Sequence, residues 1–399
     1  MGSIIETIAA KPERLIIGMM SGSSADGVDA ALVKVRGCGE SLSWRLLRHE
    51  TLQYSPRVRD LILECSEPGS GNAASICRLN MLLGELFARA ALHLAQRAGI
   101  DIQAVDLIGS HGQTLQHLSE AVTITGIPVR GSLQVGEPSI ISERTGVTTI
   151  ASFSARDMAV GGQGAPLVSY VDYLLFRHRA RGRVIISLGG VANVTAIPAS
   201  AGPDRVIAFD TGPGTMVIDG LVARMTGGRE SFDHDGRYGR RGQIRPHLLA
   251  HWLDHPYLRQ PPPKSCGREE FGRPFLDAIL REHASISKDD LIATATRFTA
   301  EAIAMACRNY AMPYNVYEEA IVSGGGACNS FLMQQLRDAI PELSIKESDE
   351  YGLPVVAKEA VAFAILANES LLGQPCNLPA ATGASRRVVL GIISPGRQA

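Results

Sequence analysis

The chain has 399 residues, enough for two or three domains or for one large protein with two lobes. Its 39 Lys and Arg nearly balance 40 Asp and Glu, which excludes the strongly basic surface of a dedicated nucleic-acid-binding protein. The longest apolar stretch, residues 360–367, is too short to cross a membrane. The chain begins without a signal-peptide pattern, and its seven cysteines are scattered without a Cys-x-x-Cys pair. We therefore expect a cytoplasmic protein with reduced thiols and without nucleic-acid or membrane partners.

The first predicted elements are two strands around a polar turn. Residues 15–20 and 28–35 are apolar runs, and the turn 21–27 between them is rich in Gly and Ser. The turn contains Asp26, and Asp29 follows it closely. This pattern predicts a hairpin whose glycine loop carries two carboxylates.

A helix and two buried strands are predicted next. Apolar residues recur at steps of three and four over 75–98, and Gly99 ends the pattern. Short apolar runs at 105–109 and 148–153 predict strands, and the second is followed by a glycine-rich loop at 161–164.

The opening pattern recurs about 170 residues later. Strands are predicted at 184–188 and 191–197, with Gly189 and Gly190 between them. A further strand at 206–209 leads directly into Asp-Thr-Gly-Pro-Gly. Two similar lobes are the simplest explanation of this repetition. The remaining expectations are a helix from Met216, loops and short helices over 232–273, a helix at 289–310, a strand at 319–323, a turn at 324–326, and helices at 329–339 and 358–372.

The glycine loops indicate phosphate binding, although the standard motifs are absent. Neither GxxxxGK[ST] nor GxGxxG after a strand occurs, which excludes a P-loop and a dinucleotide fingerprint. Backbone N–H groups of glycine loops can converge on phosphate oxygens, and Asp26 or Asp29 can ligate Mg²⁺. Phosphoryl transfer also needs a base near the acceptor, and Asp210 at a strand end is the best-placed carboxylate.

Each of these features also has a purely structural interpretation. A glycine loop between strands is most often an ordinary hairpin, and the two aspartates of the first loop can be turn residues. Asp210 can cap the following helix. Arg156 and Asp157 can form a local ion pair, and Glu359 can be a solvated helix residue.

Eight motifs together resemble one family, the anhydro-N-acetylmuramic acid kinases, which have the actin, sugar-kinase and Hsp70 class of ATPase fold. The motifs keep the family's order and span nearly the whole chain. FDTGPG together with ARDMAVGGQGAPL is the most specific combination. The matching segments are GMMSGSSADGVDAALV (18–33), GSHGQT (109–114), ARDMAVGGQGAPL (155–167), ISLGGVANVT (186–195), FDTGPG (209–214), KSCGREEF (264–271), VSGGGACNSFLMQQL (322–336) and DEYGLP (349–354).

The resemblance implies a two-lobed α/β, ribonuclease H-like ATPase fold with an interlobe cleft. The first lobe is expected at 14–145 plus about 376–398, and the second at 146–375. The implied reaction uses ATP, Mg²⁺ and water. It opens the 1,6-anhydro ring of 1,6-anhydro-N-acetylmuramic acid and phosphorylates O6, giving N-acetylmuramic acid 6-phosphate for bacterial cell-wall recycling. A homodimer is implied by analogy alone.

The resemblance also assigns roles to individual residues. Asp210 matches the catalytic base that activates water, and Asp26 is the expected magnesium ligand. The sugar is expected to bind at Thr114, Arg156 and Glu359, where Arg156 suits the lactyl carboxylate. The residues expected to bind ATP are Gly22, Ser23, Ser24, Ala25, Asp26, Gly27, Val28 and Asp29 in the first phosphate loop, Gly189, Gly190 and Asn193 in the second, and Gly324, Gly325 and Gly326 on the adenosine side.

The chain departs from the family pattern at a few positions. Ser152 stands where the family usually has Asp, and Thr215 where it often has Asn, so details of the sugar pocket stay open. Two alternatives also stay open: a kinase for another anhydro- or amino sugar, and a non-catalytic ATP or sugar sensor on the same fold.

Overall fold

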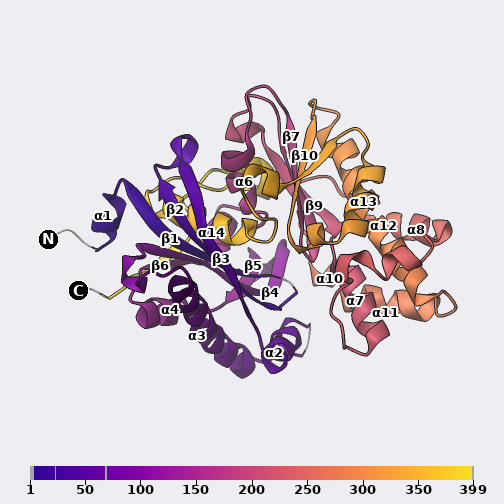
Figure 1. Ribbon diagram of the computed structural model, residues 1–399, viewed down its shortest axis with the longest axis horizontal. Coiled ribbons are helices and arrows are strands. Elements are labelled where there is room, and N and C mark those ends of the chain that lie inside the picture. Colours follow the sequence, from indigo (N-terminus) through magenta and orange to yellow (C-terminus); the bar gives the residue numbers. More distant parts are fainter. Residues whose placement is uncertain (1–3, 23, 68–69, 398–399) are drawn as a thin grey trace. The chain divides into compact units, whose positions relative to one another are not determined.

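The computed structural model describes residues 4–22, 24–67 and 70–397, and the chain forms two compact units (Figure 1). Unit 1 comprises Met1–Leu174 and Ala357–Ala399, and unit 2 comprises Leu175–Val356. These bounds differ from the expected ones, because residues 146–174 and 357–375 lie in unit 1.

Unit 1 is built on one mixed sheet. Its strand order is β12-β6-β4-β1-β2-β3, with β5 paired to β4. Strands β1, β2 and β3 are antiparallel neighbours in chain order. Strand β4 runs parallel to β1, and β6 runs parallel to β4. The pairing of β6 with β4 explains why the segment after residue 145 belongs to unit 1. The strands are β1 Glu13–Ser21, β2 Gly27–Arg36, β3 Ser43–Gln53, β4 Leu107–Ile124, β5 Ile127–Val135, β6 Thr149–Ala151 and β12 Ile392–Ser394.

Two helices cover the two faces of this sheet. Apolar side chains of α3 (Ala73–Arg97) pack on Ile17 and Met19. The alternate residue Gly18 faces α14 (Lys358–Leu371), where a Cβ on Gly18 would lie 1.9 Å from the Ala360 carbonyl oxygen. Because successive strand residues point to opposite faces, α3 and α14 lie on opposite sides of the sheet. The packing of α14 explains why the segment after Ala357 returns to unit 1.

Unit 2 repeats the same strand order on a smaller scale. Its sheet runs β11-β10-β7-β8-β9, again with three antiparallel neighbours followed by two parallel strands. The α/β class and the duplication predicted from the two glycine hairpins are therefore confirmed for each unit. The cleft expected between the lobes stays a prediction. The strands are β7 Arg183–Leu188, β8 Val191–Ile197, β9 Ile207–Pro213, β10 Glu319–Ser323 and β11 Ser344–Glu347.

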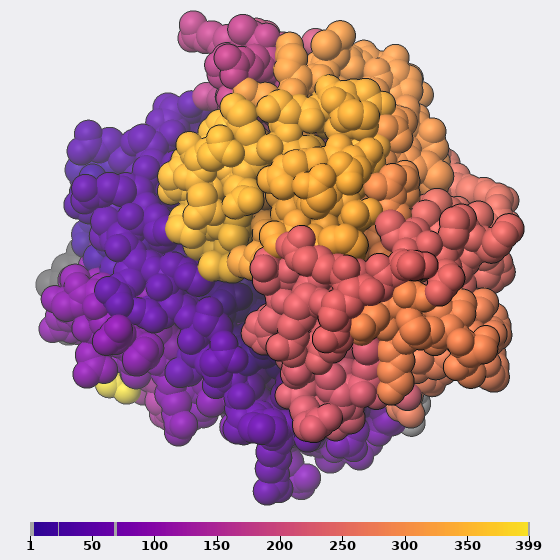
Figure 2. Space-filling model, turned by 45° about the vertical axis from the view of Figure 1, so that its right-hand side comes forward, coloured from indigo at the N-terminus to yellow at the C-terminus, as the bar shows by residue number. Residues whose placement is uncertain are grey.

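Helices and short connections complete both units. The helices expected at 75–98, 289–310, 329–339 and 358–372 are present with ends shifted by a few residues. In the space-filling view, a gold patch of the C-terminal part of the chain is exposed at the surface, and a few bright yellow spheres near the C-terminus lie apart from it at the lower left (Figure 2). No helix among the described residues is long and apolar enough to cross a membrane. The other helices are α1 Ile4–Ala9, α2 Pro56–Ser66, α4 Pro138–Thr145, α5 Phe153–Ala159, α6 Val168–Phe176, α7 Met216–Thr226, α8 Pro246–Leu253, α9 Pro256–Arg259, α10 Arg268–Phe271, α11 Arg273–Glu282, α12 Lys288–Ala306, α13 Ser330–Ala339 and α15 Pro379–Thr382.

Candidate active site

Asp210 lies in the middle of β9 and is almost completely buried, at 7% exposure. Its register partner on β8 is the half-buried Asn193, beside a bulge. The carboxylate accepts a hydrogen bond from the backbone N–H of Cys266 at 3.0 Å. The helix that follows, α7, has Thr215 at its N-cap position, so Asp210 is not a helix cap.

Burial raises the pKa of Asp210 from its ordinary value to about 7. The Cys266 N–H and the Lys264 ammonium group oppose this rise, and the negative charge of Glu269 adds to it. A carboxylate with a pKa near neutral is half ionised at pH 7, which suits a general base.

The predicted second phosphate loop packs closely on the end of β9. The N–H groups of Gly214 and Met216 donate to the Gly190 carbonyl, at 2.9 and 3.1 Å, and the Thr215 N–H donates to the Gly189 carbonyl at 2.9 Å. A Cβ on Gly214 would lie 2.1 Å from the Gly189 carbonyl oxygen, so only glycine fits there. These contacts join the Gly-Gly turn to the segment that carries Asp210.

The predicted adenosine loop reaches the same end of the sheet. Gly324 has a φ of +91°, and a Cβ on it would lie 2.6 Å from the Leu188 carbonyl oxygen, directly before Gly189. Gly326 is similarly close to Leu188, whereas a Cβ on Gly325 would meet open space. The two glycine loops of unit 2 are thus neighbours, and Gly325 leaves room for a ligand.

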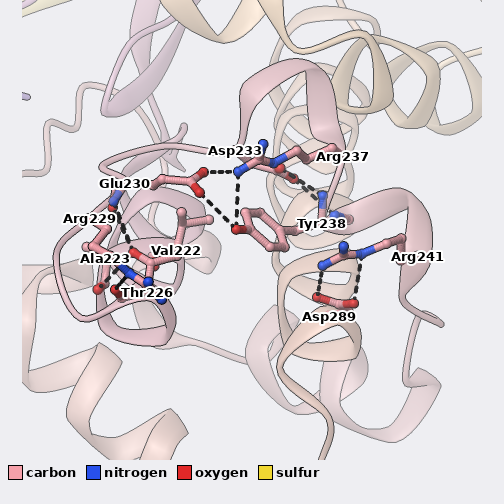
Figure 3. Close-up of polar contacts among 11 residues, drawn as sticks. Val222, Ala223, Thr226, Arg229, Glu230, Asp233, Arg237, Tyr238, Arg241 and Asp289 are labelled. Carbon is pink, nitrogen blue, oxygen red and sulfur yellow. Dashed lines mark hydrogen bonds and ion pairs between the residues drawn. The ribbon is translucent and has the colours of Figure 1, made fainter.

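A polar strap over residues 230–241 is held by contacts among its own side chains and by an ion pair to Asp289 of α12 (Figure 3). Asp233 accepts hydrogen bonds from the N–H groups of Tyr238 and Gly239, at 2.9 and 3.0 Å. Tyr238 bonds Glu230 at 3.1 Å, and Arg241 pairs with Asp289. The Asn329 side chain, the N-cap of α13, is 3.5 Å from the Asp233 carbonyl. The strap therefore supports the start of α13.

The first phosphate loop lies in unit 1, between β1 and β2. Gly22, Ala25 and Gly27 shape the turn: Ala25 has a φ of +53° and its N–H donates to the Gly22 carbonyl at 3.1 Å. Ser24 and Val28 complete the described part of the loop, while Ser23 lies outside the described residues.

The two aspartates of this loop have different surroundings. The side chain of Asp26 is 43% exposed and lies 3.4 Å from Arg59. Asp29 accepts a hydrogen bond from Thr51 at 2.5 Å, and burial raises its pKa. Asp26 is therefore the more accessible carboxylate for a metal ion.

The motif GSHGQT contributes a residue that the sequence analysis did not single out. Gln113 is buried, accepts a hydrogen bond from Ser21 at 2.6 Å, and donates to the Gly22 carbonyl at 3.2 Å. It thereby fixes the entry to the first phosphate loop. Because Gln113 lies in GSHGQT, one of the motifs shared with the family, that motif could have identified it from the sequence.

Glu359 lies in the first turn of α14 and is only half buried by surface area, but burial of its carboxyl group raises the pKa to about 7. The negative charges of Asp29 and Asp172 add to this rise, and Lys358 opposes it. Lys358 itself forms a buried ion pair with Asp172 at 2.8 Å. Glu359 is thus near Asp29 of the first phosphate loop, and it is not an ordinary solvated helix residue.

Arg156 is exposed on α5, whereas the side chain of its neighbour Asp157 is buried. The Asp157 carboxylate is fully buried and accepts hydrogen bonds from Gly164, Asn377 and Thr382, at 2.9, 2.7 and 2.8 Å. The alternative of an Arg156–Asp157 ion pair is therefore not favoured. The guanidinium group of Arg156 is open to an anionic ligand.

A polar cavity of about 120 Å³ lies in unit 1, beside Thr114 and the start of α5. Gln134 lines it and is 3.4 Å from the Thr114 hydroxyl, and Ser152 lines it from the N-cap of α5. The Ser110 hydroxyl is buried without a partner at this wall. Burial lowers the pKa of the neighbouring His111 to about 4, so that ring is neutral at pH 7. The cavity suits uncharged polar groups better than anions.

The sheet duplication, the glycine-lined strand ends and the buried base-like carboxylate define a class of protein, the two-unit α/β phosphotransferases. The chain belongs to the anhydro-N-acetylmuramic acid kinase family, whose model matches residues 14–396. Curated relatives with that name are 44% identical in Caldanaerobacter subterraneus (96% of this chain, 98% of the relative) and 42% identical in Salinibacter ruber (97% and 98%). A relative in Bacillus thuringiensis is 39% identical (95% and 98%).

Two solved structures that are similar to this chain superpose on it weakly. The activator of a 2-hydroxyisocaproyl-CoA dehydratase from Clostridium difficile aligns at 12% identity with a TM-score of 0.46, covering 90% of this chain and 95% of that one. A ROK family glucokinase from Streptomyces griseus aligns at 14% identity with a TM-score of 0.40, covering 89% and 99%.

Proposed function

We propose that this protein is an ATP-dependent anhydro-N-acetylmuramic acid kinase that opens the 1,6-anhydro ring with water and phosphorylates O6. The observation that carries the proposal is the buried Asp210, whose pKa is about 7, on a strand whose following residues are hydrogen-bonded to the Gly189–Gly190 loop. The name of the family identifies anhydro-N-acetylmuramic acid as the sugar, and Asp210 is the residue that we assign as the base.

In the proposed reaction Asp210 accepts a proton from water as the water oxygen bonds to C1 of the sugar. The C1–O6 bond breaks, and O6 bonds to the γ-phosphorus as ADP leaves. The products are N-acetylmuramic acid 6-phosphate, ADP and a proton. Glycine N–H groups of the phosphate loops would stabilise the charge that develops on the phosphoryl oxygens.

Asp26 in the first phosphate loop is the carboxylate that we assign to Mg²⁺. In kinases Mg²⁺ keeps several waters and is held by one or two carboxylates together with substrate phosphates. No cluster of three potential metal ligands from His, Cys, Asp and Glu is present in the described part of the chain. Asp26 would hold the ion, which neutralises phosphate charge when bound.

Turnover of purified protein on 1,6-anhydro-N-acetylmuramic acid with ATP and Mg²⁺ tests the proposal, with product mass as the readout. We expect a product heavier than the sugar by one phosphoryl group and one water, with ¹⁸O from labelled water at C1. Phosphorylation without water would instead support a kinase for another sugar. ATP binding without a product would favour the sensor alternative.

Arg156→Ala should raise KM for the anhydro sugar roughly ten- to hundredfold, because a charge-assisted hydrogen bond to the lactyl carboxylate is lost. The kcat value should change little. Steady-state kinetics on 1,6-anhydro-N-acetylglucosamine, which lacks the lactyl group, provide the matched control. An equal defect on both sugars would contradict the assignment of Arg156 to the carboxylate.

A further inference from the structure

The segment from Tyr257 to Cys266 holds Asp210 at three points. The Tyr257 hydroxyl donates to the Asp210 carbonyl at 2.9 Å, and the Asp210 N–H donates to the Lys264 carbonyl at 3.1 Å. The Cys266 N–H donates to the carboxylate itself at 3.0 Å. Both ends of this proline-containing segment therefore determine where the carboxylate lies.

The side chain of Lys264 closes this segment on itself. Lys264 is only 3% exposed, and its ammonium group donates to the carbonyls of Tyr257 and Leu258, at 3.2 and 3.4 Å. Three aromatic rings surround the same group, those of Tyr257, Tyr310 and Phe209, with centroids at 4.7, 5.5 and 5.9 Å. A buried ammonium group is costly unless such partners compensate for its lost hydration.

We propose that Lys264 is a positioning residue for Asp210, closing the 257–266 segment so that Tyr257 and Cys266 hold the carboxylate and placing a fixed positive charge beside it. This inference rests on the proposed role of Asp210 as the base. Lys264 makes no contact with the reacting atoms in this scheme. It acts through the segment that it closes and through its charge.

The charges around Asp210 make this role measurable. The positive charge of Lys264 favours the ionised form of Asp210, whereas the negative charge of Glu269 disfavours it. The Cys266 thiol and the Tyr257 hydroxyl are neutral, because burial raises their pKa values. Burial lowers the pKa of Lys264 to about 8, and the negative charge of Asp210 opposes that shift, so the ammonium form is retained at neutral pH. Loss of the cation should therefore raise the pKa of Asp210 further.

Lys264→Met tests the inference because methionine keeps the length of the side chain without its charge or donors. The acidic limb of the pH profile of kcat should move up by about one unit, with kcat about fivefold lower at pH 7 and recovering above pH 8.5. Lys346→Met is the matched control, since Lys346 is paired with Glu319 in the same unit and is not a neighbour of Asp210. A folded Lys264→Met enzyme with an unmoved limb, or with a loss equal at all pH values, would overturn the proposal.

Lys264→Gln is the second variant, because its amide can still donate to the two carbonyls while the charge is absent. It should fold and still shift the limb. The ¹³C carboxyl titration of Asp210, assigned with Asp210→Asn, gives the same pKa shift without turnover. A wild-type protein that does not act on the sugar would therefore refute the proposed function while this titration still decides the role of Lys264. If neither variant folds by circular dichroism, Lys264 is a residue of general stability and the proposal is refuted.

Discussion

Replacing Asp210 by Asn is expected to lower kcat on the anhydro sugar by about 10²–10⁴, the usual effect of removing a general base. Asparagine has nearly the same shape and can keep a hydrogen bond to the Cys266 N–H, so the site should remain assembled. KM for ATP should change little, because the glycine loops are held by backbone contacts. Rapid-quench kinetics on the purified variant measure the effect. Turnover near that of the wild type would show that Asp210 is not the base.

The same variant should be more stable than the wild type at alkaline pH, which also verifies that it folds. Burial raises the pKa of Asp210 to about 7 in the folded chain, from an ordinary value of 3.8. Between these values the unfolded chain releases the proton while the folded chain keeps it, so the free energy of unfolding falls as pH rises. Asp210→Asn removes this dependence. Chemical denaturation should show a stability gain of the variant over the wild type at both pH 5 and pH 8, and the gain should be larger at pH 8 by about 1–3 kcal/mol.

Elements with a strong apolar pattern could be predicted from the sequence. The hairpin strands around residues 21–27 and 189–190 have buried runs beside glycine turns, and both are present. By contrast, β3, β5 and the continuation of β4 beyond residue 109 were not predicted, because polar residues interrupt the apolar pattern and most of β3, β5 and the second half of β4 is exposed or half-buried. The unit boundaries also differed, since only tertiary pairing shows that β6 and α14 belong to unit 1.

Part of the candidate site could likewise be predicted from the sequence, and part of it could not. The structure brings Asp210 and the glycine loops of unit 2 close together, because β8 and β9 are neighbouring strands joined by backbone hydrogen bonds, and the roles assigned to these residues stay predictions. The burial that gives Asp210 and Glu359 pKa values near 7 could not be predicted, because it depends on segments distant in sequence. The available signal for Lys264 was its place in the motif KSCGREEF, although a lysine next to a proline-rich loop is ordinarily solvated.

Gly109→Ala should lower the free energy of unfolding by about 1–3 kcal/mol and the thermal midpoint of unit 1 by roughly 5 °C. Gly109 pairs in register with Gly18 on the neighbouring parallel strand, and together they let α14 lie against the sheet. A Cβ on Gly109 would lie 2.1 Å from the Phe363 carbonyl oxygen and 2.8 Å from the Ala367 Cβ. The backbone of α14 must therefore move away from β4.

Because Glu359 lies in the first turn of α14, the same displacement should raise KM for the sugar, whereas KM for ATP should change less. Differential scanning calorimetry and steady-state kinetics test both expectations. Gly131→Ala is the control, since a Cβ on Gly131 in β5 meets nothing within 4 Å and should change stability by under about 0.5 kcal/mol. Equal effects of the two substitutions would mean that close packing of α14 on the paired glycines does not position Glu359.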